Sequence, residues 1–381
     1  MKKKNINSIK KIFKVLYSEN YQTIQYYPTN FSYLALIKEF ENLINIFLKK
    51  KHLIFYFSLF PSFYLIFLNK RVRILRKLFF LNKLFDKEDL KLFFDDNSIK
   101  DFIKKDLIKK VSGKYQFNYC FVPYKKFIYI RDQHQFYDGF FDPKKSRNKV
   151  WMGADSIIFL KFLNKYLEKN NFRKALEIGS GSGIVINSIS NNFNKCEAID
   201  LNNRAIKLTF INSVINNVKN LKVYKSNLFK KVKGKFNIII SNPWYVDLKK
   251  GGLEVAPSII KDIDKYLEKG GVCLLIMNSY IKKNLDPLEH YFYKVLKSKN
   301  YDINMYTNGC FYESNRSKEY KKYKVEHAVS YNVEIKTNGE GTLKIYKAPI
   351  LRRIRDFTYL KIITVSFSYR EKRFLIIWCF L

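Results

Sequence analysis

The sequence predicts an α/β protein whose main part is a doubly wound, mostly parallel sheet and whose N-terminal part is helical and winged-helix-like. Three observations support this fold class. Short apolar runs alternate with helical segments from residue 174 to residue 277, which is the order of βα units in a parallel sheet. A glycine-rich turn follows the first apolar run. Lys-rich helical segments precede residue 150.

Length and composition limit the class of protein. At about 100–200 residues per domain, 381 residues correspond to two domains or three. A content of 47% hydrophobic and 17% aromatic residues excludes a disordered, collagen-like or acidic-tail protein. The 71 Lys and Arg residues outnumber the 33 Asp and Glu residues, and the net charge of +38 favours RNA or a ribosomal component as the partner. The alternative is a basic surface that is merely solvated.

Cysteine usage and targeting signals favour a cytoplasmic location. The five cysteines are scattered and form no C-x-x-C pair, so we expect neither a disulfide framework nor a structural zinc site. No secretion signal follows the N-terminal lysines. The apolar segment 52–69 reaches the lower length limit of a membrane span, but Pro61 interrupts it. We expect two buried helical pieces there, with membrane contact as the less favoured alternative.

The first domain is expected over residues 1–149, ending in a loop at 139–148 that is rich in Gly, Pro, Ser and Asn. Two helices followed by a hairpin predict a winged-helix-like unit for substrate recognition, which can place its second helix against nucleic acid. The alternative is a packing domain with solvated lysines. The expected elements are a helix at 87–94, a helix from the capping box Ser98-Ile99-Lys100-Asp101, and a hairpin of 115–121 and 126–131 that turns at 122–124.

The second domain is expected over residues 150–350, followed by a C-terminal tail of unclear role at 351–381. Its strands are expected at 174–178, 196–199, 221–224, 236–240 and 271–277, with helices at 184–190, 204–216 and 261–267. A terminal hairpin is expected from residues 326–335 and 342–346, turning at Asn338-Gly339.

The first motif with chemical meaning is Glu177-Ile178-Gly179-Ser180-Gly181-Ser182-Gly183, directly after a strand. Glycines at alternate positions allow the backbone to turn tightly and to approach a ligand. Asp200 ends the next strand, 21 positions after Gly179, where an acidic residue can bind two ribose hydroxyls. Because the spacing is G-x-G-x-G, it favours an adenosine-type ribose without a pyrophosphate.

The second motif is Ser241-Asn242-Pro243-Trp244-Tyr245, at the end of the fourth expected strand. Loops at the carboxyl ends of parallel strands form the ligand crevice. The Asn242 amide oxygen and the Pro243 carbonyl can accept hydrogen bonds from an –NH₂ group, and Tyr245 can stack on a planar substrate. The alternative is that Asn-Pro is a turn and Trp244 fills the core.

Residues 174–277 resemble the class I S-adenosylmethionine-dependent methyltransferases. Asn242-Pro243-Trp244-Tyr245 is similar to the N-P-P-Y motif of their amino-methylating branch, which includes N6-adenine, small-domain ribosomal RNA and release-factor glutamine methyltransferases. Residues 150–156 are similar to the stretch that precedes the glycine loop in small-domain methyltransferases. The resemblance implies a seven-stranded sheet and S-adenosyl-L-methionine as the cofactor.

The resemblance also implies roles for individual residues. It places Gly179, Gly181 and Gly183 against the methionine part of the cofactor, with Glu177 ordering their loop. Asp200 would hold the ribose. The remaining implied residues are Asn227 at the adenine, Asn242 beside the cofactor, and Asn242, Pro243 and Tyr245 at the target nitrogen. Asn227 departs from the Asp that is common in these families, and Trp244 replaces the second proline.

The function expected from these roles is N-methylation of a planar amino or amide nitrogen of a macromolecule, with ribosomal RNA as the first expectation. The alternatives are a protein glutamine-N5 methyltransferase of release-factor type and a non-catalytic RNA-binding protein that keeps the fold. Positioning of the nitrogen is the main task of such a site, and no general base is required. None of the four histidines has triad-like or metal-like spacing, so no metal site is expected.

Overall fold

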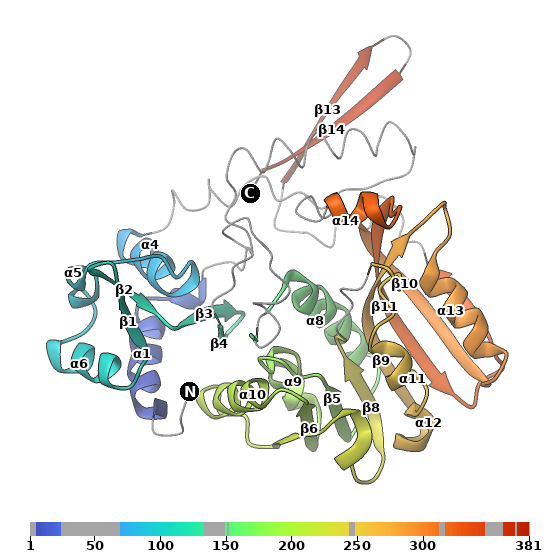
Figure 1. The fold of residues 1–381 in the computed structure, drawn as a ribbon, viewed down its shortest axis with the longest axis horizontal. Helices are drawn as coiled ribbons and strands as arrows, with labels where there is room; N and C mark the ends of the chain where they lie inside the picture. The colour runs from blue at the N-terminus through green and yellow to red at the C-terminus, as the bar shows by residue number, and fades with distance from the viewer. Residues whose placement is uncertain are drawn as a thin grey trace.

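The structure is a computed structural model. It describes residues 5–23, 69–132, 149–150, 152–243, 248–311, 317–346, 361–369 and 372–380. Figure 1 shows a largely helical part in blue and cyan beside a part built on a sheet in green, yellow and orange. We call the first of these the front unit, which comprises the described residues 5–23 and 69–132. The strands β13 (Lys361–Tyr369) and β14 (Lys372–Phe380) form a separate antiparallel hairpin near the C-terminus.

The main sheet has the order β12-β10-β11-β9-β8-β5-β6-β7. All neighbours are parallel except β11, which is antiparallel to both β9 and β10. This confirms the doubly wound, mostly parallel sheet, although its described part has eight strands because β12 is added at one edge. The strands are β5 (Lys174–Ile178), β6 (Lys195–Asp200), β7 (Leu221–Lys225), β8 (Phe236–Ser241), β9 (Leu267–Ile281), β10 (Tyr301–Phe311), β11 (His327–Thr337) and β12 (Leu343–Tyr346).

The terminal hairpin expected from residues 326–335 and 342–346 is wrong. β12 pairs in parallel with β10, with Ile303 opposite Leu343. β11 already has β9 and β10 on its two edges, so it has no edge left for β12. The Asp302 carboxylate on β10 accepts hydrogen bonds from the backbone of Glu340 and from the backbone and hydroxyl of Thr342. These bonds draw the turn toward β10.

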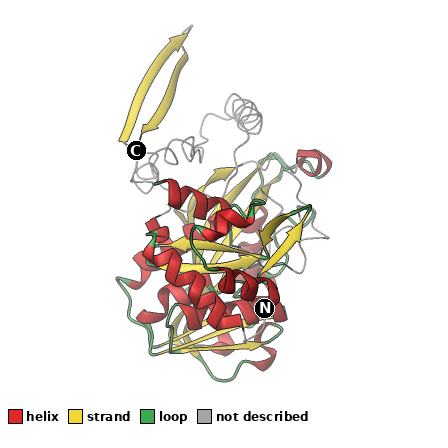
Figure 2. Ribbon diagram, turned by 90° about the vertical axis from the view of Figure 1, so that its left-hand side faces the viewer, coloured by secondary structure: helices red, strands yellow, loops and turns green. Residues whose placement is uncertain are grey.

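Helices cover both faces of the sheet, as Figures 1 and 2 show. Side chains alternate between two cores along the central strands: Ala175 faces one core and its neighbour Leu176 faces the other. The first core continues into α8, α9, α10 and the front unit, and the second contains α11, α12 and α13. The helices are α8 (Ala154–Leu167), α9 (Ile184–Ile189), α10 (Asn203–Ile215), α11 (Ala256–Ile260), α12 (Ile263–Tyr266), α13 (Pro287–Leu296) and α14 (Ser317–Lys322).

The front unit has the helices-then-hairpin order expected from the sequence. A bridge between Phe85 and Tyr115 joins the chain ahead of α5 to the β1–β2 hairpin. Phe79, Phe117 and Phe121 pack together at its centre. Its first elements are α1 (Ile6–Ser18), α4 (Lys70–Leu75) with a π-helical turn at Arg76–Phe80, α5 (Lys87–Lys91), α6 (Asp96–Lys104), β1 (Ile108–Val111) and β2 (Lys114–Phe117).

The single hairpin expected from 115–121 and 126–131 is wrong in its pairing. The chain forms two hairpins, β1–β2 and then β3 (Tyr119–Tyr124) with β4 (Phe127–Asp132). Ser112 and Gly113 both have positive φ, as a tight two-residue hairpin turn requires. The second turn lies at Lys125-Lys126, beyond the expected turn at 122–124, because those residues are buried within β3.

Several predicted features lie outside the described residues. They are the apolar segment up to residue 68, the loop at 139–148, Trp151, Trp244 and Tyr245. In the described ranges, no helix has the length and apolar character needed to cross a membrane.

Candidate active site

The two predicted motifs meet at one edge of the sheet. Strands β5, β6 and β8 run parallel, with Ile178 opposite both Ile199 and Ser241. The residues that follow these three positions are Gly179, Asp200 and Asn242. Strand pairing therefore brings the glycine turn, the Asp200 carboxylate and the Asn242 amide to the same carboxyl edge of the sheet.

The glycine turn leaves open space at two of its three glycines. Gly179, Gly181 and Gly183 have φ values of 74°, 55° and 74°. A Cβ atom added at Gly179 or Gly181 would meet nothing within 4 Å. At Gly183 it would lie 2.7 Å from side-chain atoms of Asn187 and Thr209. Gly179 and Gly181 therefore face an open cradle, whereas Gly183 allows close packing inside the protein.

Glu177 lies under the glycine turn. Its side chain is buried, and its Oε2 atom accepts a hydrogen bond of 3.3 Å from the backbone N–H of Ile186 in the first turn of α9. Burial raises the pKa of Glu177 well above its ordinary value, and the nearby Asp200 carboxylate adds to the rise. Glu177 thus ties the turn to the helix that follows it.

Asp200 lies beside the glycine turn and is hydrogen-bonded to it. Its Oδ2 atom accepts the Gly181 N–H at 3.0 Å, and its Oδ1 atom accepts the Asn202 N–H at 2.8 Å. Burial raises the pKa of Asp200, while these backbone donors act in the opposite direction. A carboxylate fixed beside an open glycine cradle fits the ribose end of S-adenosylmethionine.

Asn227 is exposed and follows β7, the neighbour of β6. The backbone N–H of Ser226 bonds to the Asp200 carbonyl at 3.1 Å, so Asn227 directly follows a residue that is hydrogen-bonded to the backbone of Asp200. This is the order that the resemblance implies for an adenine contact.

Asn242 has a partner that the sequence did not reveal. Its Nδ2 atom donates to Asp155 Oδ2 at 2.7 Å and to Ser156 Oγ at 3.3 Å. Both partners lie in the first turn of α8, more than 80 residues earlier in the chain. The only sequence signal was their place within the 150–156 stretch. Pro243 is buried directly after Asn242, and the predicted Tyr245 lies outside the described residues.

The comparisons with known proteins agree with this geometry. The family model described as the methyltransferase small domain matches residues 156–304. A provisionally named protein N5-glutamine methyltransferase of Methanocaldococcus jannaschii is 32% identical over 160 residues, which are 37% of this chain and 79% of that protein.

Two other relatives match shorter regions. A release factor glutamine methyltransferase of Fusobacterium nucleatum is 32% identical over 32% of this chain and 35% of its own length. A ribosomal RNA small subunit methyltransferase C of Salmonella arizonae is 27% identical over 28% of this chain and 32% of its own length. The chain thus spans about a third of the length of these two relatives.

The matched region begins at Ser156 in the first turn of α8 and contains the glycine turn, Asp200 and Asn242, which meet at the carboxyl edge of the sheet. With a family match over this site and a relative matched over 79% of its length, the chain belongs to the methyltransferase small-domain family of S-adenosylmethionine-dependent methyltransferases.

Proposed function

We propose that this protein is an N-methyltransferase that methylates a planar amino nitrogen of RNA, with ribosomal RNA as the substrate. The observation that carries the N-methyltransferase part of this proposal is the hydrogen bonding of Asn242 at the carboxyl edge of the sheet. The Nδ2 atom of Asn242 donates one hydrogen to the Asp155 carboxylate. Its second hydrogen is directed to Ser156. The amide oxygen is the group left to accept a hydrogen bond from a target –NH₂.

The chain's own residues then have simple tasks. S-adenosylmethionine, when bound, supplies an activated methyl group. Asn242 and the Pro243 carbonyl accept hydrogen bonds from the target nitrogen and hold it in line with that methyl group. Gly179 and Gly181 provide backbone surface for the methionine part, and Asp200 binds the ribose. Tyr245 stacks on the target, and Asn227 contacts the adenine.

The distribution of charge supports RNA as the substrate. Between Asp200 and Asp247 the sequence has no acidic residue, whereas it has one arginine and eight lysines. The seven lysines from Lys219 to Lys235 are all exposed, on or near the edge strand β7. The front unit adds exposed lysines on β1 and β2. We propose that residues 1–149 recognise the RNA and that residues 150–350 bind the cofactor.

A second candidate function is methylation of a glutamine side chain in a translation protein. The relative from Methanocaldococcus jannaschii, which is matched over 79% of its length, is named as a protein N5-glutamine methyltransferase. A carboxamide is also planar with an –NH₂ group, so the Asn242 oxygen would serve it equally well.

The experiment that separates the two candidates uses the purified full chain, methyl-labelled S-adenosylmethionine and an unmodified cell extract. The product is divided between RNase and protease before counting. Label lost to RNase is the result we expect, and label lost only to protease would replace RNA with glutamine as the target. The variant Asn242→Ala should reduce labelling about 100-fold, because the target nitrogen loses its orienting acceptor. Asn237→Ala, at the opposite end of the same strand, is the matched control.

A further inference from the structure

Helix α10 is fastened to the edge of β4 by two asparagine side chains one helical turn apart. Asn212 Oδ1 accepts the Ile130 N–H at 2.8 Å, and its Nδ2 donates to the Ile130 carbonyl at 2.9 Å. Asn216 makes the same pair of bonds with Ile128, at 3.3 and 3.0 Å. Four helical residues rise about 6 Å and two strand residues about 6.6 Å, so the two spacings match.

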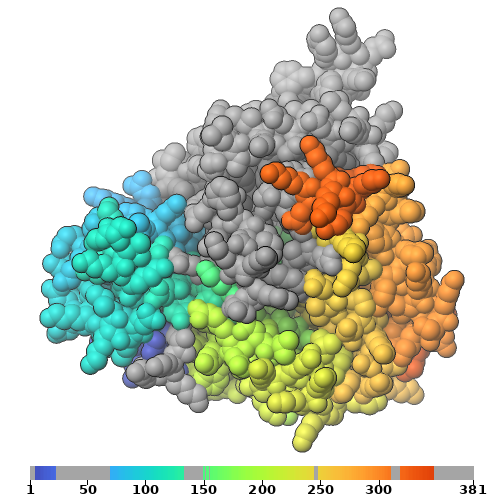
Figure 3. Space-filling view, viewed as in Figure 1, coloured from blue at the N-terminus to red at the C-terminus, as the bar shows by residue number. Residues whose placement is uncertain are grey.

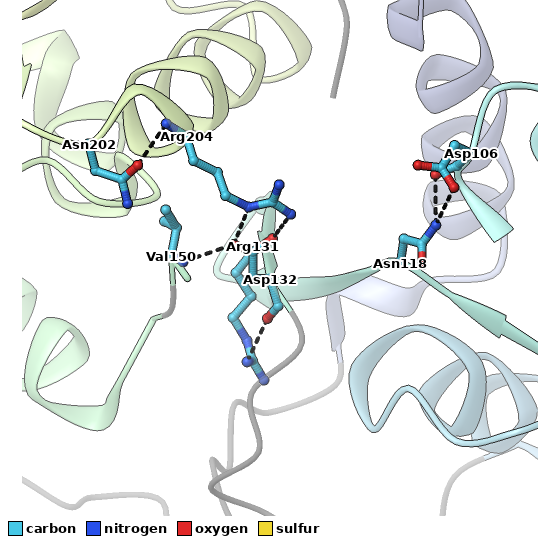
Figure 4. A network of polar contacts seen from close by, with 7 residues as sticks. All are labelled: Asp106, Asn118, Arg131, Asp132, Val150, Asn202 and Arg204. Atoms are coloured by element: carbon cyan, nitrogen blue, oxygen red, sulfur yellow. Dashed lines mark hydrogen bonds and ion pairs between the residues drawn. The ribbon is translucent and has the colours of Figure 1, made fainter. Parts of the chain in front are cut away.

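An ion pair continues this attachment at the next alternate residue of β4. Asp132 is buried and pairs with Arg204 in the first turn of α10, as Figure 4 shows. The Asp132 carboxylate also accepts the Val150 N–H at 2.9 Å. The Arg204 N–H bonds to the Asn202 side chain, and the Asn202 N–H bonds to the Asp200 carboxylate. The end of β4 is thereby linked through Arg204 and Asn202 to Asp200, the proposed ribose-binding residue.

Asn212 and Asn216 differ in a further bond that each Nδ2 atom donates. That of Asn216 goes to the Asn212 backbone carbonyl at 2.9 Å, whereas that of Asn212 goes to the carbonyl of Ser182 in the glycine turn at 2.8 Å. Asn212 is fully buried, and its three described bonds use both of its donor hydrogens and its acceptor. Thr209, one turn earlier, donates to the Gly181 carbonyl at 3.1 Å. Side chains of α10 are therefore hydrogen-bonded both to the glycine turn and to β4.

We propose that Asn212 is a positioning residue that couples the front unit to the cofactor-binding turn. A displacement of β4 moves Ile130, and the shared amide transmits that displacement to Ser182. Coupling free energy is reciprocal, so cofactor binding at the turn must also stabilise β4. The proposal rests on the cofactor-binding part of the proposed function and is independent of the methylated substrate.

The test compares Asn212→Ala with Asn216→Ala in the full chain. Both variants lose a paired contact with β4, but only Asn212→Ala loses the contact with the turn. We expect Asn212→Ala to weaken the binding of S-adenosylhomocysteine, measured by calorimetry, by about tenfold. Asn216→Ala should bind it within about twofold of the wild type. Affinities are compared at a temperature where circular dichroism shows both variants folded. Equal affinities in the two variants would overturn the proposal.

A second measurement needs no variant. Hydrogen exchange of the wild-type chain is followed with and without S-adenosylhomocysteine. We expect slower exchange at Ile128 and Ile130 when the compound is bound, and unchanged exchange there would contradict the coupling. If the wild type failed to bind S-adenosylhomocysteine at all, the proposed function would fail. That result differs from a wild type that binds and an Asn212→Ala variant that binds equally well.

Discussion

The two hairpins of the front unit, with strands of 4 residues in β1–β2 and 6 residues in β3–β4, have opposite surroundings. In β1–β2, Lys109, Lys110 and Lys114 are exposed. In β3–β4, every residue of β3 is buried, and the edge of β4 is bonded to α10. Figure 3 shows the blue and cyan surface of the front unit beside the green surface that contains α8 to α10. The β1–β2 hairpin thus exposes its lysines to solvent, whereas the β3–β4 hairpin fastens the front unit to α10.

The largest expected effect concerns the stability contributed by the buried hairpin. Phe121 on β3 is buried and packs against Phe13, Phe79 and Phe117. Phe121→Ala should lower the free energy of unfolding by about 3–5 kcal/mol, because it removes a buried ring and leaves a cavity. Denaturant unfolding measures this. Lys110→Ala in the exposed hairpin is the control, and a similar loss in both variants would erase the distinction.

The second prediction tests whether Asp155 in α8 fixes the orientation of the Asn242 amide at the target nitrogen. Asp155→Asn replaces an acceptor with a group that can also donate, so Asn242 no longer has one fixed orientation. We expect kcat to fall about 10- to 100-fold while the affinity for S-adenosylhomocysteine is unchanged. Asp264→Asn, in the first turn of α12, is the matched control. An unchanged kcat in Asp155→Asn would show that the contact does not orient Asn242.

The third prediction concerns the exposed hairpin. Replacing Lys109 and Lys110 with Glu should weaken RNA binding about tenfold at low salt and reduce its salt dependence, because phosphate contacts are lost. Lys261→Glu with Lys269→Glu, near α12, changes the net charge equally and should have a smaller effect. RNA titrations at several salt concentrations provide the comparison. Equal weakening by the two pairs would mean that charge alone, and not this hairpin, attracts RNA.

The smallest expected effect is a pH dependence of folding stability that arises from Glu177, the buried residue before the glycine turn. Burial raises the pKa of Glu177 above its ordinary value of 4.5, so the folded state favours the protonated form. The stability that protonated Glu177 contributes is complete below the ordinary pKa of the unfolded chain. It is lost as the pH rises through the raised pKa of the folded state. The variant Glu177→Gln cannot ionise. Its Tm relative to the wild type should therefore increase as the pH rises from about 4.5 toward neutrality. Thermal melts of Glu177→Gln and of the exposed Glu340→Gln across this range test the sign.

Local signals predicted much of the cofactor side of the site. Gly179 and Gly181 follow a strand directly, and Asp200 ends the next one, so adjacent parallel strands were enough to predict that they would meet. The same signals misplaced the hairpins. Residues 122–124 read as a turn because of Pro123, yet burial in β3 outweighs that preference. Strand β12 pairs with β10 because of three hydrogen bonds to Asp302, which no local pattern contains.

The sequence by itself determined the order of strands and helices, the glycine turn, and the residue types at the carboxyl edge. Those features depend on neighbours within a few positions or on the alternation of apolar runs. Only the tertiary structure decided that Asp155 orients Asn242 and that Asn212 joins β4 to the turn. These contacts span 87 residues for Asp155 with Asn242, 82 for Ile130 with Asn212, and 30 for Ser182 with Asn212. An asparagine on a helix gives no local sign of its partner, because the partner is chosen by how the folded elements pack.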